Sequence, residues 1–196
     1  SEWISTTCHK AMFCLVDLFA EYFDTISFML GDVLRVISAC FKRDRPTDIL
    51  CQIGNGCIHQ LVTLTGPRLS SELWDLVCVH IGQAAITIDA ASNFFQYHTG
   101  TNTVSYNSST LMSNMSVECR AQTLLLDTCN DIIATQYDNM ETRHIESFLQ
   151  SLFTSYESAR NLNTSQVFSQ FLKNSSKVPL TEFITQETKA LSLYLS

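Results

Sequence analysis

Cysteine and histidine stand two positions apart in two places, at Cys57-x-His59 and at Cys78-x-His80. Thiolate and imidazole groups are preferred zinc ligands, so these pairs are the first candidates for chemistry. Both pairs fall in predicted helices, where side chains two residues apart point about 200° away from each other. Structural zinc sites use wider spacings, such as C-x2-4-C and H-x3-5-H. We therefore predict packing roles for these residues, and no metal or other cofactor.

The eight cysteines could instead form disulfides. Cys8 and Cys14 are six residues apart, as are Cys51 and Cys57. On a helix six residues turn the side chain by about 240°, so neither pair can close within its helix. Bridges between cysteines distant in sequence stay open at this level. Reduced thiols pack as small apolar residues, and we favour them together with a cytoplasmic setting.

Motifs of nucleophilic or phosphate chemistry are missing from the sequence. It contains neither a G-x-S-x-G elbow nor a G-x-x-x-x-G-K-[ST] loop. Two acidic pairs, Glu72 with Asp75 and Asp127 with Asp131, stand at helical spacing. Such pairs are typical of solvated helix faces and helix starts more often than of acid–base catalysis. We predict no catalytic residues and no enzymatic activity in this chain.

A basic cluster supplies the candidate partner-binding residues, Lys42, Arg43 and Arg45. These side chains could bind a phosphoinositide or an acidic partner. The alternative is ordinary solvation of a helix end, where cations interact favourably with the exposed carbonyl groups.

Composition favours a helical, protein-binding chain. Of 196 residues 45% are hydrophobic, and only 6 Gly and 3 Pro are present. The 12 basic and 19 acidic residues give a net charge of −7, which argues against nucleic acid as a partner and against direct binding to an anionic membrane. The longest uncharged helical stretch, Leu76 to Ile88, is too short to span a bilayer.

Apolar residues recur at helical spacing along most of the chain, which predicts an all-α fold of about eight helices. Gly66 and Pro67 end one helix and Ser70 starts the next. The helices are expected at about Thr7 to Tyr22, Thr25 to Phe41, Asp48 to Leu64, Ser71 to Asp89, from about Ser116, Glu141 to Asn161, Val167 to Leu172, and after Thr181.

The helices group into pairs. Residues 1–89 are predicted to form two pairs and residues 118–196 two more, in one structural unit cut from a longer chain. Residues 90–117 carry no Asp, Glu, Lys or Arg and predict a polar loop or disordered insertion. The repeat of about 40 residues favours a HEAT- or armadillo-like solenoid of stacked antiparallel helix pairs. Its terminal helices should each leave an apolar stripe uncovered.

Four collinear stretches resemble one family. They are Ile53-Gly54-x-x-Cys57-x-x-Gln60-Leu61-Val62 with Gly66-x-x-Leu69-Ser70-x-Glu72-x-Trp74-Asp75, Leu124-Leu125-Leu126-Asp127-Thr128 with Asp131-Ile132-Ile133, Phe148-Leu149-x-x-Leu152-x-x-Ser155-x-x-x-Ala159-x-x-Leu162-Asn163, and Gln186-Glu187-Thr188-x-x-Leu191. They look like the C-terminal part of the large brefeldin A-inhibited Arf guanine-nucleotide exchange factors, the BIG family.

This resemblance implies a HEAT-like region downstream of the exchange domain, which is itself not in this chain. The expected role is non-catalytic: regulation or recruitment of a large Arf exchange factor in Golgi vesicle trafficking, through protein–protein recognition. The expected location is cytoplasmic, peripheral to membranes of the Golgi and trans-Golgi network, with indirect membrane association. The expected partners are a small GTPase of the Arf or Rab type, another domain of the parent protein, or a second copy of the chain.

Two other functions fit the sequence. A generic HEAT-repeat adaptor or scaffold, unrelated to nucleotide exchange, would show the same helix pattern. A secreted helical glycoprotein would account for the cysteines and for the N-x-[ST] sequons headed by Asn107, Asn114, Asn163 and Asn174. Counting titratable thiols in denaturant separates the secreted protein from the other two.

Overall fold

A computed structural model describes residues 4–41, 47–99, 108–174 and 180–195 of the chain. Almost all of these residues are helical and none of them lies in a strand, which confirms the predicted all-α class. The helices are the π-helix η1 (Ile4–Cys8), α1 (His9–Glu21), α2 (Phe23–Ile26), η2 (Ser27–Met29), α3 (Leu30–Ser38), η3 (Ala39–Phe41), α4 (Asp48–Thr65), η4 (Gly66–Arg68), α5 (Ser71–Thr87), α6 (Ala90–His98), α7 (Ser108–Gln136), η5 (Tyr137–Asn139), α8 (Thr142–Thr164), α9 (Gln166–Asn174) and α10 (Leu180–Leu195).

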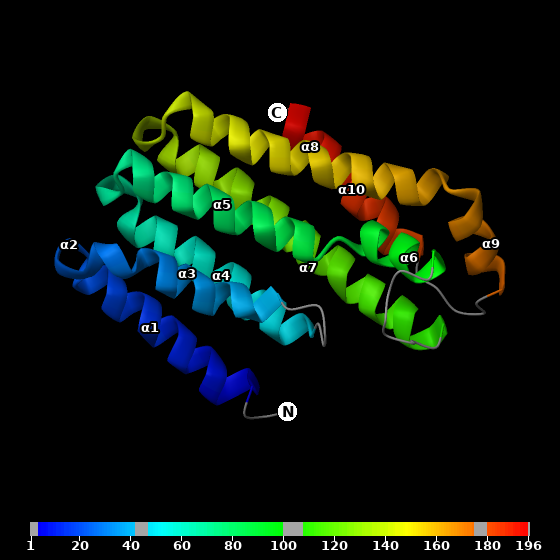
Figure 1. Cartoon of the computed structure of the whole chain (residues 1–196), viewed down its shortest axis with the longest axis horizontal. Helices are drawn as coiled ribbons and strands as arrows, with labels where there is room; N and C mark the ends of the chain where they lie inside the picture. The colour runs from blue at the N-terminus through cyan, green and yellow to red at the C-terminus, as the bar shows by residue number, and fades with distance from the viewer. Residues whose placement is uncertain (1–3, 42–46, 100–107, 175–179, 196) are drawn as a thin grey trace.

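The long helices lie side by side in two rows (Figure 1). In one row α1 contacts α4, α4 contacts α7 and α7 contacts α10, while in the other α3 contacts α5 and α5 contacts α8. The shorter α6 packs on α7 and α8 beyond the end of α5. Stacked helix pairs of the HEAT type would give this order of contacts, and the solenoid itself stays a prediction.

No described helix is by itself long and apolar enough to span a membrane. Helices α5 and α6 reach the required length and apolarity only when they are taken together, and they are bent by 44° relative to each other.

Side-chain caps fix where several helices begin. The Thr47 hydroxyl accepts a hydrogen bond from the Leu50 amide at 3.3 Å, and the Ser70 hydroxyl accepts one from the Leu73 amide at 3.4 Å. Each cap satisfies a backbone N–H that has no partner within its own helix. The predicted joint is therefore confirmed: α4 ends at Thr65, a single turn follows, and α5 starts after Ser70.

The first core cluster extends from α1 to α10, and part of it depends on close approach at two glycines of α4. A Cβ atom added to Gly54 would lie 2.8 Å from the Phe41 ring and 2.9 Å from Cys40 Cβ, and one added to Gly56 would lie 2.7 Å from the Phe13 ring. Glycine inside a helix costs roughly 1 kcal/mol relative to alanine. Here that cost permits α1 and η3 to pack directly on the α4 backbone.

The expected loop or insertion at residues 90–117 is largely helical, and this expectation was wrong over 90–98 and 108–117. The Asp89 carboxylate caps α6 by accepting from the amides of Ala91 and Ser92, so Asp89 is not the last residue of the preceding helix. Phe94 and Met115 are then buried in a second core cluster. The segment is rich in Ser and Asn, so its average composition did not reveal the apolar residues of α6 and α7 that are buried in this cluster. Residues 100–107 lie outside the described part of the chain.

Two other expectations differ from the structure. The single helix expected from Thr25 to Phe41 is divided into α2, η2, α3 and η3, with a break in helical backbone at Ile26. The helical spacing of Ile184, Leu191 and Leu195 predicts that this stripe of α10 faces inward, but the stripe is exposed and the opposite side of the helix is buried. At the other end of the row, α1 exposes the large apolar side chain of Leu18, so uncovered stripes on both terminal helices stay a prediction.

Candidate interaction surface

The structure does not bring the candidate residues of the sequence into one site. Lys42, Arg43 and Arg45 lie outside the described residues. The paired thiols and imidazoles point apart as expected: Cys57 and Cys78 are buried, whereas His59 is exposed. Across the described ranges, no three His, Cys, Asp or Glu side chains are arranged to hold a metal ion.

All eight cysteines are free thiols, and six of them are buried. Burial, the largest cause, raises the pKa of Cys78 to about 11 and those of Cys51 and Cys129 to about 12. A thiol with such a pKa stays protonated near neutral pH and is a poor nucleophile and metal ligand. The buried cysteines therefore pack as small apolar side chains, and Cys14 is the exposed one.

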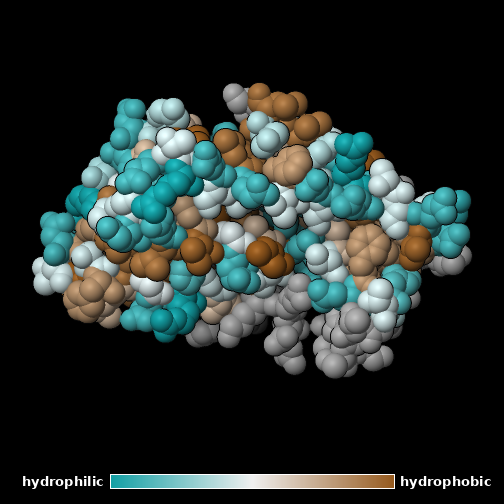
Figure 2. All heavy atoms as spheres, turned by 45° about the horizontal axis from the view of Figure 1, so that its top comes forward, coloured by the Kyte–Doolittle hydropathy of each residue, from teal (hydrophilic) through white to brown (hydrophobic). Residues whose placement is uncertain are grey.

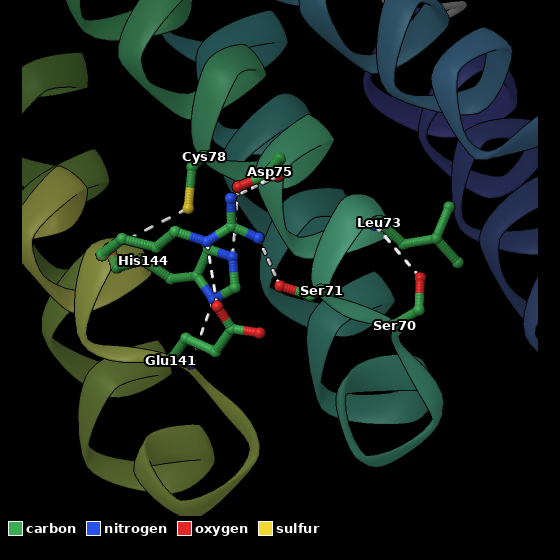
Figure 3. Close-up of polar contacts among 8 residues, drawn as sticks. Ser70, Ser71, Leu73, Asp75, Cys78, Glu141 and His144 are labelled. Carbon is green, nitrogen blue, oxygen red and sulfur yellow. Dashed lines mark hydrogen bonds and ion pairs between the residues drawn. The ribbon is translucent and has the colours of Figure 1, made fainter.

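A polar joint connects the starts of α5 and α8, two helices that lie side by side (Figure 3). The buried ring of His144 accepts a hydrogen bond at Nδ1 from the Glu141 amide at 3.0 Å. Its Nε2 must then carry the proton, which it donates to Asp75 at 3.2 Å. Both ring nitrogens form hydrogen bonds, so the imidazole caps the N-terminus of α8 and also links α8 to α5.

The Arg143 side chain lies on the solvent-facing side of this joint. Its guanidinium pairs with Asp75 at 3.2 Å and with Glu141 at 3.0 Å, and it also donates to the Ser71 hydroxyl. Hydrogen bonding from Ser71, the largest cause, together with Arg143, lowers the pKa of Glu141 below its usual value. The Glu141 carboxylate lies at the N-terminus of α8, where negative charge is favourable.

Chemistry at the joint is limited by how its groups are engaged. The Cys78 thiol donates to the His144 carbonyl oxygen at 3.9 Å, and not to the ring. The buried Trp74 lies 6.3 Å from the imidazole, ring centre to ring centre, and its indole N–H has no hydrogen-bond partner among the described residues. The cluster fixes two helix starts and presents neither a nucleophile nor an available base.

A second polar joint connects three helices of the other row. Arg120 of α7 forms two hydrogen bonds to the Asp48 carboxylate of α4, at 2.7 and 3.1 Å, and pairs with Glu182 of α10. The fork of a guanidinium matches a carboxylate in this bidentate geometry. Beside it lies a cavity of about 380 Å³ bordered by Cys51 and Leu124. No local pattern predicts that Arg120 pairs with Asp48 and Glu182, because these partners are more than 60 residues from it in sequence.

Helix α5 presents an exposed apolar face that the other described residues leave uncovered. Three side chains of α5 at helical spacing, Leu76, Val79 and Ile86, are 38%, 66% and 59% exposed. We call them the α5 ridge. In the turned view of Figure 2, hydrophobic atoms form a broken row across the middle of the molecule, between hydrophilic atoms. Single exposed apolar residues are ordinary, but several aligned on one helix face are typical of a contact surface.

A groove with a volume of about 260 Å³ lies between α5 and α8, and Ile86 of the α5 ridge is among the residues that line it. Small side chains line it, including Gly82 and Ala85 from α5 and Ser147 and Ser151 from α8. Buried Gln122 and Ser155, which are hydrogen-bonded to each other, close its floor. In the described residues the fold is all-helical, its polar clusters join neighbouring helices, and α5 presents an exposed apolar face.

Comparison with known proteins identifies relatives of part of this chain. Residues 120–196 match the family described as the BIG2 C-terminal domain. Human brefeldin A-inhibited guanine nucleotide-exchange protein 1 is 30% identical over 79 residues, which are 40% of this chain and 4% of that protein. The brefeldin A-inhibited guanine nucleotide-exchange protein 3 of Arabidopsis thaliana is 33% identical over 97 residues, which are 50% of this chain and 5% of that protein.

The yeast ADP-ribosylation factor guanine nucleotide-exchange factor SEC7 is 29% identical over 77 residues, 39% of this chain and 4% of its own length. The predicted resemblance to the BIG family is thus confirmed, and the matched part is a small fraction of each relative. Three of the four resembling stretches fall inside 120–196, while the stretch from Ile53 to Asp75 lies outside the family match. No solved structure matches the chain.

Proposed function

We propose that this chain is a non-catalytic regulatory or recruitment segment of a large Arf guanine-nucleotide exchange factor. The observation that carries the proposal is the match of residues 120–196 to the C-terminal domain of such a factor. In the described residues, the clusters of ionisable groups at Asp75 and at Arg120 are used to join helices. A segment of this kind acts by recognition, and the chemistry of exchange belongs to another part of the parent.

The proposal includes a HEAT-like architecture and a location on the cytoplasmic side of Golgi and trans-Golgi membranes, in vesicle trafficking. The order of helix contacts supports the architecture. The names of the relatives, which act as exchange factors for ADP-ribosylation factors, support the setting. The partners proposed are a GTPase of the Arf or Rab type or another domain of the parent protein.

The test compares the parent exchange factor with and without residues 1–196. Nucleotide exchange on Arf is followed on liposomes, and recruitment of the factor is followed by flotation of the same liposomes. A regulatory segment changes the exchange rate at equal recruitment, whereas a recruitment segment changes the amount of factor that floats. If neither quantity changes, the proposal is wrong.

A deletion can act by unfolding its neighbours, so a point variant accompanies it. Ile86→Asp alters the exposed α5 ridge without removing a buried side chain, and its thermal unfolding should match that of the unaltered chain. An effect of this variant on exchange or recruitment assigns the role to the surface of the segment.

A further inference from the structure

Helices α5 and α8 run parallel at a fixed register, and this sets which side chains border the groove between them. Asp75 meets His144, Gly82 lies opposite Ser151, and Asp89 accepts a hydrogen bond from Ser158 at 2.6 Å. Each of these pairs is separated by 69 residues in sequence. The two helices therefore keep side by side over about four turns, which makes the groove straight.

The two borders of the groove differ in chemistry. On the α5 side stands the apolar ridge, with Val79 at the middle of the helix and Ile86 close to its C-terminal end. On the α8 side Glu146, Gln150 and Glu157 are exposed at helical spacing. By the same register Glu146 lies level with the start of the ridge and Glu157 just beyond Ile86. Neither glutamate forms an ion pair with another described residue, so their charge is available.

The floor of the groove allows close approach from outside. Gly82 and Ala85 carry the smallest side chains, and a Cβ atom added at Gly82 would lie 4.0 Å from the Ser151 hydroxyl. Small residues at a helix surface let another helix approach with its own side chains in the depression. The groove, the ridge and the acidic border run parallel for about 15 Å, the length of ten helical residues.

From these three observations we infer that the α5–α8 groove docks an amphipathic helix of a protein partner, with its apolar stripe on the α5 ridge and lysine or arginine residues opposite Glu146 and Glu157. The apolar stripe supplies affinity and the charged flank fixes the orientation. A cationic helix is the occupant because the unpaired charges at the border are negative. The inference specifies the partner class of the recognition role proposed above, and rests on it.

The test measures binding of a fluorescent Leu/Lys model helix of about 15 residues to the 196-residue chain by anisotropy. A Leu/Glu helix of the same pattern serves as the charge control. Ile86→Asp and Val79→Asp should each weaken the Leu/Lys helix by about tenfold or more, since each removes an apolar contact. The matched control is Leu18→Asp on α1, where Leu18 is 55% exposed, close to the value for Ile86, and binding should be unchanged.

The charge requirement is tested by the double variant Glu146→Lys, Glu157→Lys. It should weaken the Leu/Lys helix and strengthen the Leu/Glu helix, and the difference should shrink at high salt. Equal binding of both helices to the unaltered chain, or equal loss in the Leu18→Asp control, overturns the inference. So does binding of the chain to phosphatidylserine vesicles that depends on Ile86, because the occupant would then be a lipid surface.

These outcomes are separate from the test of the proposed function. If the model helix fails to bind while deletion of the chain still changes exchange or recruitment, the docking site is wrong and the regulatory role stands. If the helix binds at the groove and the deletion changes neither quantity, the surface is real and the role in the exchange factor is wrong.

Discussion

The two ends of this molecule hold their helices together by different means. Around α1, η3 and α4, helices approach through apolar side chains, and Gly54 and Gly56 admit the rings of Phe41 and Phe13 against the backbone. Helices α7, α8 and α10 are joined by hydrogen bonds between buried amides and hydroxyls. Gln186 donates to Gln122 at 3.0 Å, and Gln122 donates to the Ala85 carbonyl at 2.8 Å. Ser155 completes this network.

The difference teaches how each region is specified. Apolar contact is non-directional, so shape alone sets the fit at α4, and an added methyl group is felt directly. A buried hydrogen-bond network is directional, and its members lose much of their stabilisation when one partner is removed. The N-terminal region should therefore be sensitive to volume, and the C-terminal region to loss of polar groups.

The largest effect is expected from Gly54→Ala. Its methyl group would meet buried Cys40 and Phe41, and overpacking of this kind costs about 1–3 kcal/mol of unfolding free energy. The control is Gly31→Ala, because no atom lies within 4 Å of an added Cβ there, and a helical alanine should stabilise by up to about 1 kcal/mol. Urea unfolding measures both. Destabilisation by Gly54→Ala together with stabilisation by Gly31→Ala would support the volume sensitivity of the α4 contacts. Changes of unfolding free energy in the same direction would contradict it.

Gln122→Leu tests the polar region. The variant keeps the volume of the side chain but leaves the Ser155 hydroxyl and the Gln186 amide short of a partner, so we expect a loss of about 1–2 kcal/mol. The double variant Gln122→Leu, Gln186→Leu should recover part of that loss, because fewer buried polar groups remain unpaired. A purely additive double variant would show that the network is not coupled.

A smaller, pH-dependent effect is expected at the joint between the regions. The pKa of Glu141 is lowered in the folded chain, so its carboxylate stabilises the fold above the ordinary pKa near 4.5 and loses this contribution as pH falls through the folded value. Glu141→Gln should lower the melting temperature slightly at pH 7. The gap to the unaltered chain should close below about pH 4. A gap that stays constant with pH would contradict the assignment.

The last prediction concerns the rates at which the cysteines react with a thiol reagent, and it requires no change in stability. All eight cysteines should react with a thiol reagent in denaturant without reductant, as expected for free thiols. In the folded chain Cys14 should react fast, while Cys51 and Cys129, whose pKa values burial raises to about 12, should react only upon unfolding. Fewer than eight thiols in denaturant would instead favour the secreted glycoprotein.

Local sequence patterns predicted where helices form more accurately than they predicted how those helices pack. The Ser70 cap and the helical spacing of the buried Val16, Phe19 and Phe23 can be read from the sequence, because each depends on residues within one or two turns. The close approach at Gly54 involves η3, a separate helix, and depends on how the two helices pack. The helical part of 90–117 was missed because its composition is polar on average. The basic cluster at 42–45 stays untested, and the groove was missed because its two borders are 69 residues apart.

The sequence by itself determined that this chain forms helices, where several of them begin, and which family its C-terminal part resembles. These properties follow from backbone hydrogen bonding, caps and periodicity, which act over a few residues. Only the tertiary structure decided which apolar stripes are covered and which remain exposed. A stripe on α10 and the ridge on α5 are both amphipathic patterns, and burial depends on whether another helix arrives to cover them, which no local interaction sets.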